Sequence, residues 1–170
     1  MFYYIFTCSG IPANATLTRP AIDPNPPGPF SLEIQDTIKK YQPKAAEHLD
    51  RLKDILGVEF SFSVDFSILH KHLPNSIFKK RMGEVILDQY LGALVNNIIE
   101  FLQKYPEKKM SFIFKTTKKN IIFNALKVKA NKPMEVVFEQ GNICINLEPT
   151  EFGFLPEKTG NNLGSLLFDN

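Results

Sequence analysis

The sequence predicts one α+β domain, in which a mostly antiparallel sheet of about five to six strands is covered by an amphipathic helix and a long, largely buried helix. Apolar and polar residues alternate strictly from 58 to 66, which is typical of a strand with one buried face. A mostly apolar stretch from 77 to 105 is too long for a strand. Four short runs between 110 and 147 are separated by turn residues, which favours antiparallel neighbours.

The composition supports a single domain that spans residues 1–170. Of the 170 residues, 44% are hydrophobic and 22% are charged, as in ordinary globular domains that bury a sizeable core. The chain has fifteen Phe and no Trp. Because Phe carries no polar group, the sequence predicts an apolar core rich in Phe.

The N-terminal part contains a short predicted strand at 2–8 and then a proline-rich arm or loop at about 11–30. Its prolines exclude regular helix and central strand. A polyproline ligand for an SH3-type domain is the alternative interpretation of this arm. The prolines are Pro12, Pro20, Pro24, Pro26, Pro27 and Pro29.

Two helical segments are predicted between 31 and 57. Ser31 is suited to cap the first segment, and Pro43 suits the first turn of the second. Gly57 supplies a stop. Apolar residues at helical spacing, with Glu47 and Arg51 on the polar side, predict an amphipathic helix that covers the sheet.

The long helix is predicted from about 77 to 105. Its polar positions fall four residues apart and therefore form one narrow stripe on an otherwise apolar cylinder. We expect this helix to be mostly buried. The stripe consists of Glu84, Asp88, Gly92, Asn96 and Glu100.

The C-terminal part is predicted to be a meander of four strands at 110–115, 121–130, 134–139 and 142–147. Residues 104–132 hold nine lysines and a single acid, Glu107. A basic hairpin formed by the first two strands would bind a partner through lysines on its rim. The predicted binding residues are Lys115, Lys118, Lys119, Lys127 and Lys129.

Two interpretations of these lysines remain open. They would bind a phosphate-rich partner, such as RNA or an anionic membrane surface, with an affinity that falls steeply with salt. Alternatively, they keep exposed strand edges solvated and protect them from pairing.

The histidines and cysteines do not predict a metal-binding or catalytic site. His70 and His72, with Asp65 nearby, are candidates for metal ligands, but residues two apart do not share a helical face, and we expect no metal. Cys8 and Cys144 are far apart and are predicted to be free thiols. The sequence contains no nucleophile elbow, Walker loop, dinucleotide-binding glycine series or HExxH pair, so we expect no catalytic residue and no cofactor, and an enzyme is disfavoured.

The location expected from the sequence is cytoplasmic. The apolar run at 2–6 lacks the features of a signal peptide, and no stretch reaches the roughly 18 to 20 apolar residues of a membrane span.

Three classes of function follow. The first is a non-enzymatic protein-interaction or regulatory domain that uses a sheet surface and the basic hairpin. The second is a carrier of a lipid or other apolar ligand in a cavity between helix and sheet. The third is an anionic-surface or RNA binder, or a membrane-active protein, because the element order alone is similar to that of small α/β cytolysins.

Overall fold

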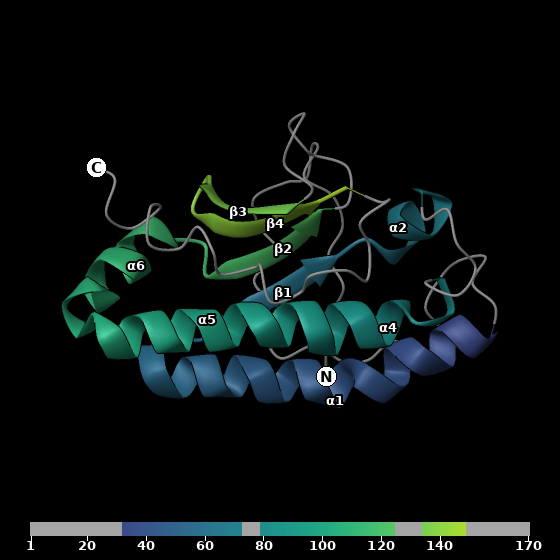
Figure 1. Cartoon of the computed structure of the whole chain (residues 1–170), viewed down its shortest axis with the longest axis horizontal. Coiled ribbons are helices and arrows are strands. Elements are labelled where there is room, and N and C mark those ends of the chain that lie inside the picture. Colours follow the sequence, from purple (N-terminus) through teal and green to yellow (C-terminus); the bar gives the residue numbers. More distant parts are fainter. Residues whose placement is uncertain (1–31, 73–78, 125–133, 149–170) are drawn as a thin grey trace.

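A computed structural model describes residues 32–72, 79–124 and 134–148. These residues form a four-stranded sheet packed against helices, so the predicted α+β class is confirmed (Figure 1). The proline-rich arm at 11–30 and the predicted strand at 2–8 lie outside the described residues. In chain order the elements are α1 (Leu32–Leu56), β1 (Ser61–Val64), α2 (Phe66–His72), α4 (Met82–Glu84), the π-helix η1 (Val85–Tyr90), α5 (Leu91–Lys104), the 3₁₀-helix η2 (Pro106–Lys108), α6 (Lys109–Lys115), β2 (Asn120–Asn124), β3 (Met134–Glu139) and β4 (Asn142–Leu147).

The sheet is mixed, with the strand order β1-β2-β4-β3. The pairs β1–β2 and β2–β4 are parallel, and only β3–β4 is antiparallel. The prediction of a mostly antiparallel sheet of five to six strands is therefore wrong for the described part of the chain. The physical reason is the connection from β1 to β2, which passes through the long helix and brings the chain back in the same direction.

One of the predicted strands, 110–115, is the helix α6 instead. Short apolar runs satisfy a strand period and a helix period about equally well. Pro106 at the start of η2 provides the backbone angles that begin a helix. Only Phe112 of α6 is buried. The alternation of residues between 110 and 115 therefore does not correspond to the buried face of a strand.

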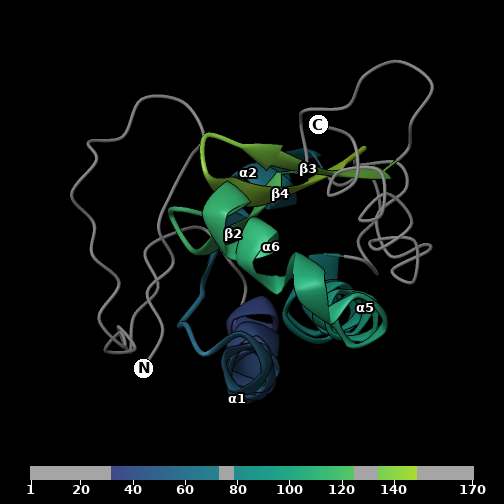
Figure 2. The ribbon, with the colours of Figure 1, turned by 90° about the vertical axis from the view of Figure 1, so that its left-hand side faces the viewer.

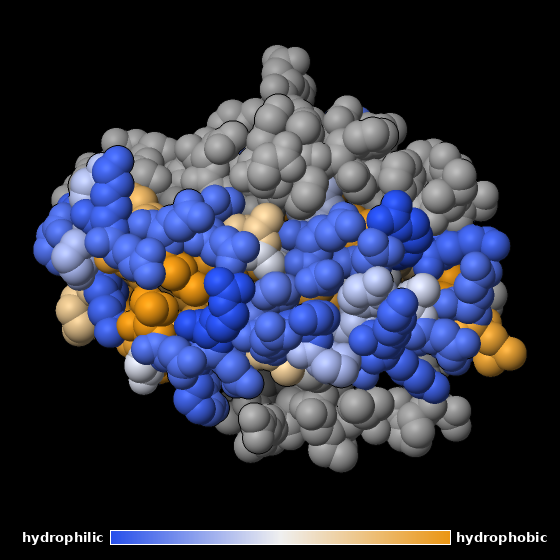
Figure 3. Space-filling model, turned by 60° about the horizontal axis from the view of Figure 1, so that its bottom comes forward, coloured by the Kyte–Doolittle hydropathy of each residue, from blue (hydrophilic) through white to orange (hydrophobic). Residues whose placement is uncertain are grey.

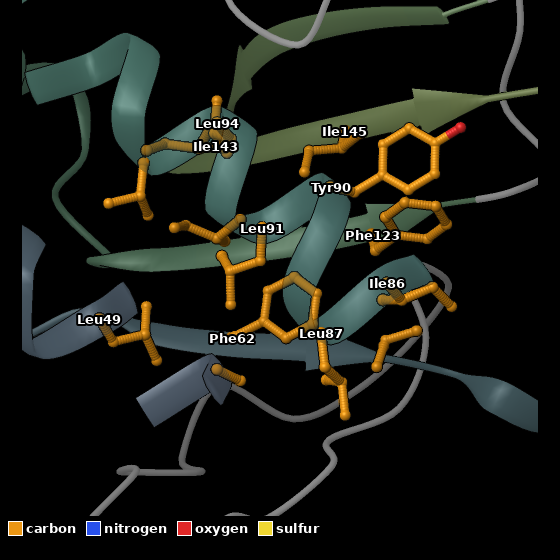
Figure 4. Packing of buried hydrophobic residues seen from close by; sticks show 14 of the residues in the cluster. Leu49, Phe62, Ile86, Leu87, Tyr90, Leu91, Leu94, Phe123, Ile143 and Ile145 are labelled. Atoms are coloured by element: carbon orange, nitrogen blue, oxygen red, sulfur yellow. The ribbon is translucent and has the colours of Figure 1, made fainter. Parts of the chain in front are cut away.

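The helices α1 and α4–η1–α5 run in the same direction on one face of the sheet (Figures 1 and 2). Between helix and sheet, Tyr90 of η1 packs edge-on against Phe123 of β2, with ring centroids 5.4 Å apart. Leu91 and Leu94 are fully buried in the same layer, opposite Ile143 and Ile145 of β4 (Figure 4). The predicted cover helix and long helix are thus both present.

A single helix replaces the two segments predicted around Pro43, which lies inside α1. An internal proline costs about 3 kcal/mol in a helix. Burial of the apolar face offsets this cost, because Ile38, Ala45 and Leu49 on either side of Pro43 are all buried. The stop at Gly57 is confirmed: its φ is 75°, and its N–H donates to the carbonyl of Lys53 at 2.7 Å.

The long helix is described from Met82 to Lys104 and includes the six-residue π-segment η1. It is long and apolar enough to cross a membrane, by length and composition only, although the sequence analysis found no such stretch. Of its most apolar window, 56% is buried inside the fold, as in core helices of soluble proteins. The prediction of a mostly buried helix is confirmed.

The predicted strand at 58–66 is shorter in the structure, where β1 covers only Ser61–Val64. Asp65 ends it by capping α2, because its Oδ1 accepts hydrogen bonds from the backbone N–H groups of Ser67, at 2.9 Å, and Ile68, at 3.0 Å. Strands β3 and β4 lie where they were predicted. Gln140 and Gly141 between them both have positive φ, 52° and 79°, as in the type I′ turns that join tight hairpins.

Candidate functional site

Six lysines gather at one end of the molecule, which we call the basic end. They belong to the segment from the last residue of α5 to the turn before β2, which contains only one acid, Glu107. The segment lies where α1 and α5 both end (Figure 1). The basic end is defined by Lys104, Lys108, Lys109, Lys115, Lys118 and Lys119.

Two large apolar side chains are exposed among these lysines. Met110 is 55% exposed and Phe114 is 70% exposed. They are four residues apart on α6 and therefore share a helical face. Leu32, 76% exposed, is the third large exposed hydrophobic residue in the described part of the chain, and it begins α1 at the opposite end of the molecule (Figure 1).

Phe112, on the other side of α6, fixes this short helix to the core. It is fully buried, and its ring centroid lies 6.2 Å from that of Phe60 and 5.8 Å from that of Phe138. Such aromatic contacts stabilise by about 0.5–1.5 kcal/mol each beyond the area they bury. The exposed face of α6 is consequently held by a buried anchor.

The turn that follows α6 has a fixed backbone and exposed lysine side chains. The Lys118 N–H donates to the carbonyl of Gly141 at 2.9 Å, and the Lys119 carbonyl accepts from the Ser61 N–H at 2.9 Å. Lys119 has a φ of 49°, and its N–H donates to the carbonyl of Thr116 at 2.8 Å. These bonds join the turn to both β1 and the β3–β4 hairpin. The backbone positions of the two lysines are therefore fixed, while their side chains are exposed.

The structure brings together three of the five predicted binding residues. Lys115 ends α6 and is partly exposed, and Lys118 and Lys119 are exposed in the turn. Lys127 and Lys129 lie outside the described residues. A helix and a turn position the lysines, so the predicted hairpin with a strand at 110–115 is wrong.

Met110 and Phe114 were not predicted to be surface residues. Both were assigned to the predicted strand at 110–115, together with Phe112. Their spacing of four residues was the available signal, because helical geometry places 110 and 114 together and sets 112 on another side.

A second constellation joins α1 to the long helix. His48 Nε2 lies 3.0 Å from Asp88 Oδ1, and Asp88 belongs to the π-segment. The His48 ring rests over Gly92, where a Cβ atom would lie 2.8 Å from it. Its Nδ1 is buried and has no hydrogen-bond partner within the part of the chain that the structure describes. With one nitrogen bonded and the other enclosed, this pair is a helix–helix contact and presents no nitrogen to a substrate.

The sheet face opposite the helices carries polar residues that bond to one another. Asn120 Oδ1 accepts from the hydroxyls of Ser61, at 2.9 Å, and Ser63, at 3.1 Å. Asn124 Nδ2 donates to Asn146 Oδ1 at 3.3 Å. Mutual pairing satisfies these groups and fixes the register of β1, β2 and β4.

The structure describes the surroundings of His70 and Cys144 among the histidines and cysteines considered in the sequence. Burial, and then the nearby charge of Lys79, lower the pKa of His70. Cys144 is a buried free thiol in β4, and Cys8 lies outside the described residues. Within 32–72, 79–124 and 134–148, no group of three or more His, Cys, Asp or Glu residues could hold a metal ion.

No protein-family model, curated protein or solved structure matches the chain. Its function must therefore be argued from its own residues. Of the constellations described, the basic end alone combines exposed charge of one sign with exposed apolar side chains. Exposed apolar residues within a ring of charge are typical of interaction surfaces.

Proposed function

We propose that this chain is a non-enzymatic binding module that recognises a phosphate-rich, polyanionic surface through its basic end. The observation that supports this is the concentration of charge. The whole chain has 20 basic and 18 acidic residues, yet the segment from 104 to 119 has six lysines and one glutamate. A nearly neutral chain thus carries a locally strong positive potential.

The magnitudes suit a reversible contact. A lysine near an anionic surface contributes about 1 kcal/mol, and several of them acting together give useful affinity at low salt. The Debye length is about 8 Å at physiological ionic strength, so exposed lysines act only at close range. The fixed backbone of Lys118 and Lys119 reduces the entropy lost when their side chains bind.

The other surfaces of the molecule are weaker candidates for a binding site. The sheet surface, which the sequence analysis preferred for a protein partner, is covered by helices on one face and self-bonded on the other. An apolar ligand between helix and sheet would have to displace the fully buried Tyr90, Leu91 and Leu94. The basic end needs no such rearrangement.

Charge reversal in the turn tests the proposal. We expect the wild-type protein to bind phosphocellulose at low salt and the double variant K118E/K119E to elute at clearly lower salt. The matched control is K39E/K71E, which makes the same change in net charge at exposed lysines outside the basic end. Equal losses in both variants, or no retention of the wild type, would show that the basic end is not the binding surface.

A further inference from the structure

We infer that the polyanionic surface is an anionic lipid bilayer, which the molecule meets end-on. Met110 and Phe114 enter the boundary between headgroups and acyl chains, while the lysines around them contact lipid phosphates and carboxylates. This inference rests on the proposed function, because it names the partner of the same basic end.

The exposed apolar pair favours a bilayer over a nucleic acid. Met110 and Phe114 expose 55% and 70% of their surface beside lysines. An RNA partner could stack a base on Phe114, but it offers little to a methionine side chain. The segment 104–119 also contains no arginine, the residue best suited to bidentate phosphate and base recognition. Lysines around an apolar helical face are typical of interfacial membrane contacts.

The acidic residues near this end do not oppose such a contact strongly. Glu59 is exposed, but its carboxylate pairs with Lys53 Nζ at 2.6 Å. Lys53 belongs to the last turn of α1, which ends at the same end of the molecule. Glu107 is then the one acid within the basic end itself. Asp54, exposed in the last turn of α1, and Glu139, beside the turn that contains Gly141, add two acids near the basic end. Anionic lipids would therefore meet a surface with an excess of lysines.

The place of α6 in the fold sets the orientation. It lies at the end where the parallel helices α1 and α5 stop, while Leu32 marks the far end of α1 (Figure 1). On the face below the helices, hydrophobic residues form a patch toward the same left-hand end within a mainly hydrophilic surface (Figure 3). A bilayer that takes up α6 would leave both long helices pointing away from it.

The absence of tryptophan allows a direct measurement. F114W places the sole Trp in the basic end, and L32W places it at a comparably exposed apolar position at the opposite end. Each variant is mixed with vesicles of phosphatidylcholine and phosphatidylserine that carry brominated acyl chains. We expect a blue shift and quenching for F114W and neither for L32W. Vesicles of phosphatidylcholine alone should leave both spectra unchanged.

The variant M110S/F114S separates the lipid inference from the proposed function. Both side chains are exposed, so the fold should persist, as circular dichroism would verify. We expect its affinity for the phosphatidylserine vesicles to fall by at least about ten-fold, because apolar burial is lost. Its retention on phosphocellulose should be unchanged, since all lysines remain.

Each failure has its own meaning. If the wild type binds phosphocellulose but F114W is not quenched by vesicles, the lipid inference is wrong and the proposed function stands. If neither probe is bound, both are wrong. Quenching of L32W equal to that of F114W would contradict the end-on orientation, and unchanged vesicle binding of M110S/F114S would contradict insertion of the apolar pair.

Discussion

Apolar residues recur at helical spacing both in the interface between α1 and the long helix and on the exposed face of α6. They are buried in the first region and exposed in the second. At the interface, Gly83 approaches α1 so closely that a Cβ atom would lie 2.5 Å from the backbone carbonyl of Thr37. On α6, Met110 and Phe114 repeat at four residues and stay exposed. Periodicity thus shows which residues share a face, and only a packing partner decides whether that face is core or surface.

The polar residues differ in the same way between the two regions. At the helix–helix interface, Asp88 of the stripe meets the His48 side chain. Glu84 of the same stripe pairs with Arg81, three residues earlier in the chain, at 2.7 Å. At the basic end, most of the charge has one sign, so the lysines cannot neutralise one another. Acidic partners thus offset charge in the first region, whereas like charges gather in the second.

The largest expected difference is in the effect of apolar truncation. L91A should lower the free energy of unfolding by about 2–5 kcal/mol, because Leu91 is fully buried and the surrounding side chains cannot fill the space. F114A should stay within about 0.5 kcal/mol of the wild type, because its side chain is already in water. Urea denaturation followed by circular dichroism measures both, and similar losses would contradict the contrast between the regions.

The close approach at Gly83 should give the next largest effect. Alanine is about 1 kcal/mol better than glycine in a helix, which favours G83A, but its Cβ would collide with backbone that cannot move aside cheaply. Such overpacking costs about 1–3 kcal/mol or more, so we expect a net loss of stability.

G57A is the matched control for this substitution. No atom lies within 4 Å of a Cβ there, and only the positive φ of 75° opposes alanine. The loss of stability should be about 1–2 kcal/mol, because a Cβ atom disfavours the left-handed backbone conformation. If thermal unfolding shows that G83A is more stable than the wild type, the inference that α1 and the long helix are in close contact at Gly83 is wrong.

The smallest expected effect is on the pH dependence of stability, through Glu84 of the polar stripe on the long helix. The hydrogen bond from Arg81 lowers the pKa of Glu84 below its ordinary value of 4.5, against the opposing effect of burial. The unfolded chain therefore binds more protons than the native chain as pH falls from 4.5 through the lowered pKa, and stability is lost in that window.

E84Q should remove this part of the acid dependence, at a cost of about 0.5 kcal/mol near neutral pH. R81Q should do the same with Glu84 intact. Unfolding free energies measured from pH 3 to 7 would show it, and acid limbs that remain as steep as in the wild type would rule out this pairing.

Much of the described fold follows from local signals. Gly57 at the end of α1, the strands β3 and β4, and the long apolar helix were predictable because each depends on neighbours in the sequence. The parallel pairing of β1 with β2 was not, because it depends on how the chain crosses between them. His48 and Asp88 are 40 residues apart and carry no mutual signal in the sequence.

The positive charge of the basic end was predictable from the sequence, but its secondary structure and its exposed apolar residues were not. The run of lysines around Lys115, Lys118 and Lys119 is visible in the sequence. The exposure of Phe114 is not, because an aromatic residue in an apolar run is usually assigned to the core. The four-residue spacing shows that Met110 and Phe114 share a helical face, and the burial of Phe112 shows that another side of α6 meets the core.

The pairing of β1 with β2 has a consequence for how this chain folds. Ser61 and Lys119 meet across 58 residues, whereas β3 and β4 are joined by a two-residue turn. Tight hairpins form within about 1–10 μs, whereas contacts so distant in sequence form more slowly because a long loop must close first. We therefore expect the hairpin to form before β1 pairs with β2, so that the hydrogen bond between Ser61 and Lys119 forms later than the turn between β3 and β4.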